Sequence, residues 1–191
     1  MDYNLIPVAT VKAITGATTD DVATQQGAAI IGMLQNYLGL VLKKQNITDE
    51  KITIPYKFSR CIQTHYAPIN SVTSVSLITS TAEYRPLQGH LSVGEFSVEV
   101  LPEFWACMHY SVLPSAVSAV KISYNVGLYD NWSEAPAILQ LAANELLKFK
   151  YGADYAAGYQ SEHLGDYSYT KGTFVKGLPA EIAGMLEGIE L

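Results

Sequence analysis

The sequence has few charged residues. Lys, Arg, Asp and Glu together make up 16% of the 191 residues, whereas about a quarter is usual for a globular domain. Hydrophobic residues make up 49%, so the chain can bury a core but has too few charges to coat its whole surface. We therefore expect another copy or a partner to cover part of that surface. A compact monomer with a surface rich in Ser, Thr and Tyr is the alternative.

Runs of basic residues are missing as well. The chain carries 12 Lys and Arg against 18 Asp and Glu, which gives a net charge of −6, and its longest basic run is Lys43-Lys44. Proteins that bind nucleic acid tightly concentrate Lys and Arg on one face, so tight or sequence-specific DNA binding is not expected. The same charge balance would let DNA pass the protein with few attractive contacts.

Cysteine is scarce, and no apolar run reaches the ~18 residues that a membrane-spanning helix needs. Cys61 and Cys107 are the two cysteines, and they predict small core side chains or free thiols in a reducing cytoplasm. Cys61-x-x-x-His65 and Cys107-x-His109 fit no zinc-ribbon or zinc-finger spacing, so no metal site is predicted. The N-terminus also lacks a signal-type segment. We expect a soluble protein without a membrane partner.

Catalytic signatures are absent from the sequence. A nucleophile elbow, a phosphate-cradling glycine loop and a His-Glu metalloprotease helix do not occur. Glu95, Glu99 and Glu103 alternate along or beside a predicted strand and could act as paired carboxylates, but solvent-facing strand residues are their expected role. The sequence therefore predicts no enzyme and no cofactor. A small hydrolase or ligand-binding domain, with its site in residues 80–116, is the alternative from a different class.

Two helices are predicted at the N-terminal end, over residues 8–15 and 20–43. Thr18-Thr19-Asp20-Asp21 supplies capping hydroxyls and first-turn carboxylates for the longer one. No charged residue occurs between Asp21 and Lys43, although a solvated helix normally carries Lys and Glu on its polar face. We therefore predict that this face contacts a neighbouring subunit; an exposed, amide-rich face is the alternative. The residues of the predicted inter-subunit face are Gln25, Gln26, Gln35 and Asn36.

An antiparallel β module is predicted over residues 52–126, after a polar turn at residues 46–51. From Ile52 to Phe58, apolar and polar residues alternate with the two-residue period of a strand. Pro55 within this run favours an edge position, because proline cannot donate a ladder hydrogen bond. A helix over residues 135–150 follows the module, with Pro136 in its first turn.

The C-terminal part, residues 153–191, is predicted to be a flexible Gly- and Tyr-rich arm that ends in a terminal helix. Pro179 starts this helix, and its apolar residues recur at helical spacing. The fold class is therefore α+β, with N-terminal helices that include one long helix, a central antiparallel β module and C-terminal helices. Residues 1–152 are predicted to form the main domain.

Several short motifs occur in a definite order along the chain. They are Gln35-Asn36-Tyr37-Leu38-Gly39-Leu40, Pro68-Ile69-x-x-Val72-x-x-Val75, Tyr124-x-x-Gly127, the Pro-led helix Pro136 to Phe149, Gly165-Asp166-Tyr167-Ser168, and Leu178 to Leu186. In this order they resemble the head-to-tail connector (adaptor, or head-completion) proteins of tailed bacteriophages, and the likeness covers nearly the whole chain. Where that family has an acidic residue and an arginine in its first motif, Gln35 and Leu40 stand here, so an ion pair between those positions is absent.

The resemblance implies a structural virion protein with a ring-forming connector architecture. A ring of identical subunits, twelve in number, would dock on the portal at the head-tail junction and bridge it to a stopper or tail-completion protein. Double-stranded DNA would pass through the lumen without sequence-specific binding. The particle would assemble in the bacterial host cytoplasm, and the chain could be a monomer when alone. A tail-completion or minor capsid protein at the same junction is the alternative.

Docking on a ring-shaped portal would combine many weak contacts into one strong attachment. We hypothesise that the terminal helix carries the portal-binding surface and that the arm before it orders on docking. The alternative role of its apolar row is packing on the chain's own core. The residues of the hypothetical portal-binding surface are Leu178, Ile182, Met185, Leu186 and Ile189.

Overall fold

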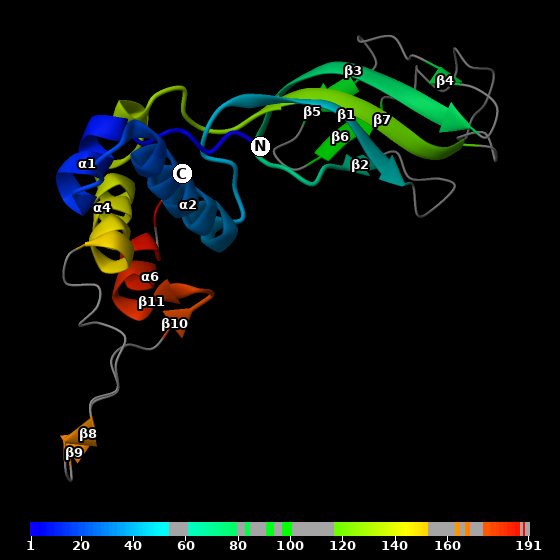
Figure 1. The fold of residues 1–191 in the computed structure, drawn as a ribbon. Coiled ribbons are helices and arrows are strands. Elements are labelled where there is room, and N and C mark those ends of the chain that lie inside the picture. Colours follow the sequence, from blue (N-terminus) through cyan, green and yellow to red (C-terminus); the bar gives the residue numbers. More distant parts are fainter. Residues whose placement is uncertain are drawn as a thin grey trace. The chain divides into compact units, whose positions relative to one another are not determined.

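The computed structural model of the chain describes residues 1–53, 61–79, 83–84, 91–93, 97–100, 117–152, 163–164, 167–168, 174–187 and 189. The fold is α+β, as the sequence predicts (Figure 1). The chain forms two compact units. We call Met1–Lys43 together with Tyr129–Leu191 the helical unit, and Lys44–Leu128 the β unit. None of the described helices is both long and apolar enough to cross a membrane.

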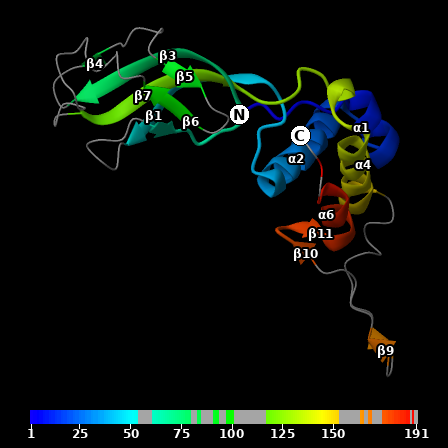
Figure 2. The ribbon, with the colours of Figure 1, turned by 180° about the vertical axis from the view of Figure 1, so that it is seen from behind.

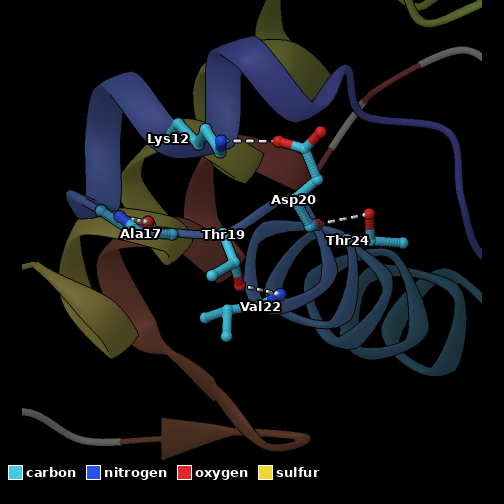
Figure 3. A network of polar contacts seen from close by, with 7 residues as sticks. Lys12, Ala17, Thr19, Asp20, Val22 and Thr24 are labelled. Carbon is cyan, nitrogen blue, oxygen red and sulfur yellow. Dashed lines mark hydrogen bonds and ion pairs between the residues drawn. The ribbon is translucent and has the colours of Figure 1, made fainter.

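Helices α1 (Val8–Thr15) and α2 (Asp20–Leu38) open the helical unit. The Thr19 hydroxyl accepts a hydrogen bond from the Val22 amide at 3.3 Å, and Lys12 of α1 forms an ion pair with Asp20 at 2.5 Å (Figure 3). The N-cap and the ion pair explain why α2 starts where the sequence predicts. Between these helices the chain turns at Gly16, whose φ of 71° suits glycine.

The end of α2 differs from the prediction, which extended the helix to Lys43. The helix ends at Leu38, because Gly39 adopts a left-handed conformation (φ 72°) and donates its amide to the Gln35 carbonyl at 2.8 Å. Leu42 lies beyond the helix end but is fully buried. Its apolar character reflects burial of the segment after the helix, not a further helical turn.

Helix α4 (Ala137–Tyr151) follows the short 3-10 helix η2 (Trp132–Glu134) and confirms the helix predicted at residues 135–150. α4 packs against α1 and α2, and the three helices lie together in both views (Figures 1 and 2). The buried side chains of α2 and α4 form the core of the unit. They include Ile30, Ile31, Leu34, Leu139, Ala142, Leu146 and Leu147.

The C-terminal part of the helical unit is a hairpin followed by a short helix. Strands β10 (Phe174–Val175) and β11 (Leu178–Pro179) pair across a turn in which Lys176 and Gly177 both have positive φ. Helix α6 (Ala180–Leu186) then packs on α4. The predicted terminal helix thus exists but stops before Ile189. Strands β8 (His163–Leu164) and β9 (Tyr167–Ser168) form a further pair.

The β unit contains an antiparallel sheet in the order β1-β7-β3-β4. Strand β7 (Val117–Val126) lies between β1 (Gln45–Thr53) and β3 (Ile69–Thr79), as Figure 1 shows, and β4 is Glu83–Tyr84. Along β7, the buried Val120, Ile122 and Tyr124 alternate with half-exposed residues. A second sheet has the order β2-β6-β5, from β2 (Cys61–Gln63), β6 (Ser97–Val100) and β5 (Leu91–Val93).

Strand β1 corrects the prediction of a polar turn at residues 46–51. Among the described strands, this segment pairs with β7 alone. Its side chains Asn46, Thr48, Asp49 and Lys51 are exposed, and an edge strand tolerates such polar residues. Asp49 has a φ of 55° where the register with β7 shifts between Ile47 and Glu50. A bulged, polar edge strand lacks the regular alternation on which the sequence prediction rested. The predicted alternation from Ile54 to Phe58 lies outside the described residues.

Candidate inter-subunit and portal-binding surfaces

Helix α2 places the four residues of the predicted inter-subunit face on different sides. Gln25 and Asn36 are exposed. Gln26 is half-buried, and its side-chain oxygen accepts a hydrogen bond from the Thr15 hydroxyl at 2.8 Å. Gln35 is 8% exposed, and its side-chain oxygen accepts the Leu42 amide at 2.9 Å. Gln26 and Gln35 thus hold α1 and the segment after α2 in place, and only the other two face solvent.

The solvent-facing side of α2 consists of small and uncharged residues. Val22 is 43% exposed, and Ala29 and Gly32 are half-buried between the exposed amides. The Tyr3 ring lies beside Gly32, where an added Cβ would come within 3.9 Å of the ring. We call this surface the α2 face; its residues are Val22, Gln25, Ala29, Gly32 and Asn36.

Helix α4 exposes large apolar side chains that sequence reasoning did not single out. Leu141 is 45% exposed and Ile138 is also exposed, although both lie in a helix whose other side is buried in the core. One turn further along, Lys148 forms an ion pair with Glu145 at 2.8 Å. A signal was present in the sequence, because apolar residues cover more of this helix than one buried stripe requires. We call Ile138, Leu141, Glu145 and Lys148 the α4 face.

The apolar row of the C-terminal segment lies mainly inside the helical unit. Leu178, Ile182 and Leu186 are buried, which corresponds to the alternative role of packing on the chain's own core. Met185 and Ile189 are half-buried. The Tyr37 hydroxyl of α2 also donates to a carbonyl oxygen of α6, that of Ala183, at 3.3 Å. Portal binding by this row stays a prediction, and these contacts mean that three of its five residues are covered.

The outer side of the same segment presents apolar groups to solvent. Phe174 is 50% exposed and Val175 is exposed as well. The Phe174 ring packs edge-on against Phe149 of α4, with ring centroids 6.2 Å apart, and the Lys176 ammonium lies 5.8 Å from the centre of the Tyr37 ring. The hairpin is thus fixed on the helical unit, while its strand β10 exposes two adjacent large apolar side chains. Their adjacency makes this strand a candidate contact surface.

In the β unit, the fold brings together two of the motifs that carry the family resemblance. Ile69 of β3 pairs with Val126 of β7. The side-chain amide of Asn70 donates to the Gly127 carbonyl oxygen at 2.7 Å, and the backbone N–H of Gly127 donates to the Pro68 carbonyl oxygen at 3.2 Å. The Pro-Ile motif and the Tyr-x-x-Gly motif are therefore two sides of one cross-strand junction. The peptide bond before Pro68 is cis.

Tyr124, the aromatic residue of the second motif, belongs to a polar cluster that sequence reasoning missed. Its buried hydroxyl donates to a carboxylate oxygen of Glu50 at 2.5 Å, and the other oxygen of Glu50 pairs with His65. Burial, followed by the Glu50 carboxylate, raises the pKa of the Tyr124 hydroxyl. The proton therefore stays on the tyrosine, and the cluster links β1, β7 and the loop before β3.

Most of the candidate metal and catalytic residues lie in parts of the chain that the structure does not describe. Cys107, His109 and most of residues 80–116 lie outside the described residues, and only the backbone is described at Cys61 and Glu99. Within the described part of the chain, no group of three or more His, Cys, Asp or Glu side chains is placed to hold a metal ion.

The fold has relatives among solved structures. A chain from the "Neck of empty GTA particle computed with C6 symmetry" superposes with a TM-score of 0.53 and 16% identity, over 87% of this chain and 83% of that one. A chain from the "Virion of native gene transfer agent (GTA) particle" gives a TM-score of 0.56 and 18% identity, over 84% and 82% of the two chains. The chain shares their fold. At such low identity the likeness concerns the fold alone. No protein-family model and no curated protein matches the sequence.

Proposed function

We propose that this protein is a structural virion component of the head-tail junction. In this proposal it forms a connector (adaptor) ring that docks on the portal and forms part of the DNA channel between capsid and tail. The strongest support is the fold shared with neck and virion chains of gene transfer agent particles. The order of the sequence motifs and the junction that joins two of them at Asn70 and Gly127 point the same way.

The ring requires contacts between identical copies, and the α2 face supplies one side of that contact. The helix has no charged residue between Asp21 and Lys43, and Gln25 and Asn36 face solvent. An uncharged surface loses less hydration energy than a charged one when another protein covers it, provided that its amides find hydrogen-bond partners. Repeated around a closed axis, one modest contact per subunit adds up to a large total interface. Twelve subunits is the expected number from the family resemblance.

The portal contact is assigned to the outer side of the C-terminal segment, with Phe174 and Val175 at its centre. Deleting residues 178–191 would be a poor test, because it removes Leu178, Ile182 and Leu186 from the core of the helical unit. Substituting Val175→Ser leaves both that core and the packing of Phe174 against Phe149 intact. We expect this variant to bind purified portal rings at least about tenfold more weakly. Thr18→Ala, an exposed change in the turn between α1 and α2, is the control and should bind normally.

Disruption of the gene in its particle-producing host tests the proposal as a whole. Negative-stain microscopy should then show DNA-filled or leaking heads beside detached, complete tails, because the joint between them is missing. Normal tailed particles would overturn the proposal. Heads joined to incomplete tails would instead favour a tail-completion protein.

A further inference from the structure

The α2 face and the α4 face complement each other in size and charge. We propose that the α2 face of one copy packs against the α4 face of the next copy, with the two helices antiparallel, and that this is the contact that closes the ring. The inference rests on the proposed function, which requires a contact between copies, and adds which surfaces meet and in which direction.

Size complementarity is the first argument. The α2 face carries the small residue Ala29 and, beside the Tyr3 ring, Gly32, and the α4 face projects Ile138 and Leu141 into solvent. Large side chains of one helix pack well over small residues of another, because the helix axes can then approach closely. Covering Leu141, which is 45% exposed, against an uncharged surface removes apolar area from water without stripping a charge of its hydration.

Charge fixes the direction of the two helices. The α2 face begins next to the exposed Asp21 and is uncharged from there to Asn36. The α4 face begins with the apolar Ile138 and ends at Lys148, whose side chain is 59% exposed. Only an antiparallel arrangement places Asp21 against Lys148 and leaves the uncharged parts of both faces opposite each other. Helix dipoles also favour this arrangement.

The register follows from the same pair of charges. When Asp21 lies opposite Lys148, equal steps of about 1.5 Å per residue along both helices bring Ala29 opposite Gln140, within one residue of Leu141. Gln25 then lies near Glu145, where its amide can donate to the carboxylate. Further along, Gly32 and the Tyr3 ring beside it lie within one residue of Ile138. Each large apolar side chain of α4 thus meets a small residue of α2.

The contact has to form between copies. Within one chain, α2 and α4 already pack through their buried sides, so their solvent faces are two different surfaces of the same unit. A contact between two different surfaces is heterologous, and repetition of such a contact produces a closed ring or an open filament.

Disulfide trapping tests the register directly. In a chain with Cys61→Ser and Cys107→Ser, the added pair Ala29→Cys and Leu141→Cys should give a ladder of disulfide-linked multimers on oxidation at high protein concentration. A mixture of the two single-cysteine chains should give dimers that contain one of each. Ala29→Cys combined with Glu181→Cys, which is exposed on another surface, is the control and should give no ladder.

Charge exchange tests the direction. Asp21→Lys alone and Lys148→Glu alone should each weaken self-association about tenfold or more, because like charges then face each other. The two changes in one chain should restore it, since every contact again pairs opposite charges. Glu181→Lys alters the net charge as Asp21→Lys does, but away from both faces, and should have no effect. Circular dichroism checks that each variant keeps its helices.

The outcomes separate this inference from the proposed function. Amine cross-linking could detect multimers that the cysteine pair does not trap and that charge exchange does not restore. That result would overturn the α2–α4 contact and leave the ring in place. Absence of multimers under every condition, including addition of purified portal rings, would overturn both.

Discussion

The side-chain amide of Asn70 donates to the Gly127 carbonyl oxygen at 2.7 Å and to the Asn125 side-chain oxygen at 3.0 Å. Asn125 in turn donates to the Asn46 side-chain oxygen at 2.9 Å. Three asparagines thus form a chain of hydrogen bonds across β3, β7 and β1. This ladder ties the two motifs of the β unit to its edge strand.

Replacement of Asn70 by Ala should loosen this junction. The change removes two hydrogen bonds, each contributing about 0.5–1.5 kcal/mol to the free energy of unfolding. We expect amide hydrogens of β3 and β7 near the junction to exchange faster, which hydrogen-exchange mass spectrometry measures. Ser71→Ala, at the exposed neighbouring position, should leave the exchange rates unchanged. Equal exchange in both variants would contradict the role given to Asn70.

Truncation of the adjacent residues Gln35 and Asn36 should change the free energy of unfolding by very different amounts. Gln35→Ala leaves the amide of the fully buried Leu42 without its acceptor, at a cost of about 1–3 kcal/mol in the free energy of unfolding. Asn36→Ala changes an exposed side chain and should alter that free energy by less than about 0.5 kcal/mol. Urea unfolding, monitored through the circular dichroism signal of the helices, measures the free energy of unfolding of both variants. Similar losses of stability in the two variants would contradict a stabilising role of the hydrogen bond between Gln35 and the Leu42 amide.

Tyr124 should make stability depend on alkaline pH. Its folded-state pKa is raised, first by burial and then by Glu50, so its contribution to stability is complete below the unfolded-state pKa of about 10. Above that pH the unfolded chain loses the phenolic proton first, and stability falls by at most about 1.4 kcal/mol per pH unit from this group.

The variant Tyr124→Phe isolates this effect. It lacks the hydroxyl and should be less stable than the wild type at pH 8, because the Glu50 carboxylate loses its donor. The difference in the free energy of unfolding should then shrink as the pH rises above 10. Urea unfolding at several pH values provides the measurement, and a constant difference up to pH 11 would refute the prediction.

The C-terminal segment should contribute strongly to the stability of the helical unit. Ile182 is 5% exposed on α6, and truncation of a buried Ile to Ala costs about 2–5 kcal/mol. We expect Ile182→Ala to lower clearly the midpoint of thermal unfolding, monitored through the circular dichroism signal of the helices. Glu181→Ala, one position earlier and exposed, should change it little. If Ile182→Ala has no effect on stability, α6 is not an integral part of the unit.

The sequence predicted the helices well where local signals mark their ends. Thr19 and Asp20 predicted the start of α2, and Pro136 that of α4, because capping and the fixed φ of proline act within a few residues. The end of α2 was misplaced because Leu42 continues an apolar pattern. That residue is buried by the fold after Gly39 has already ended the helix.

The candidate surfaces were predicted only in part, for a related reason. The absence of charge from Asp21 to Lys43 identified α2 as a helix with an unusual face. It did not distinguish the exposed Gln25 from the buried Gln35, because both are amides, and burial depends on which neighbouring segment folds back over the helix. On α4 the sequence held a signal, since apolar residues cover more of the helix than one buried stripe requires, but it did not specify that Leu141 is one of the exposed residues.

By itself, the sequence determined the α+β class and the positions of the main helices, since periodicity and caps are properties of neighbouring residues. Only the tertiary structure decided that polar β1 joins β7 as an edge strand, that Asn70 meets Gly127, and that the row from Leu178 to Leu186 turns inward. These outcomes depend on contacts between segments far apart in the chain, and no local pattern specifies which distant segment will supply them.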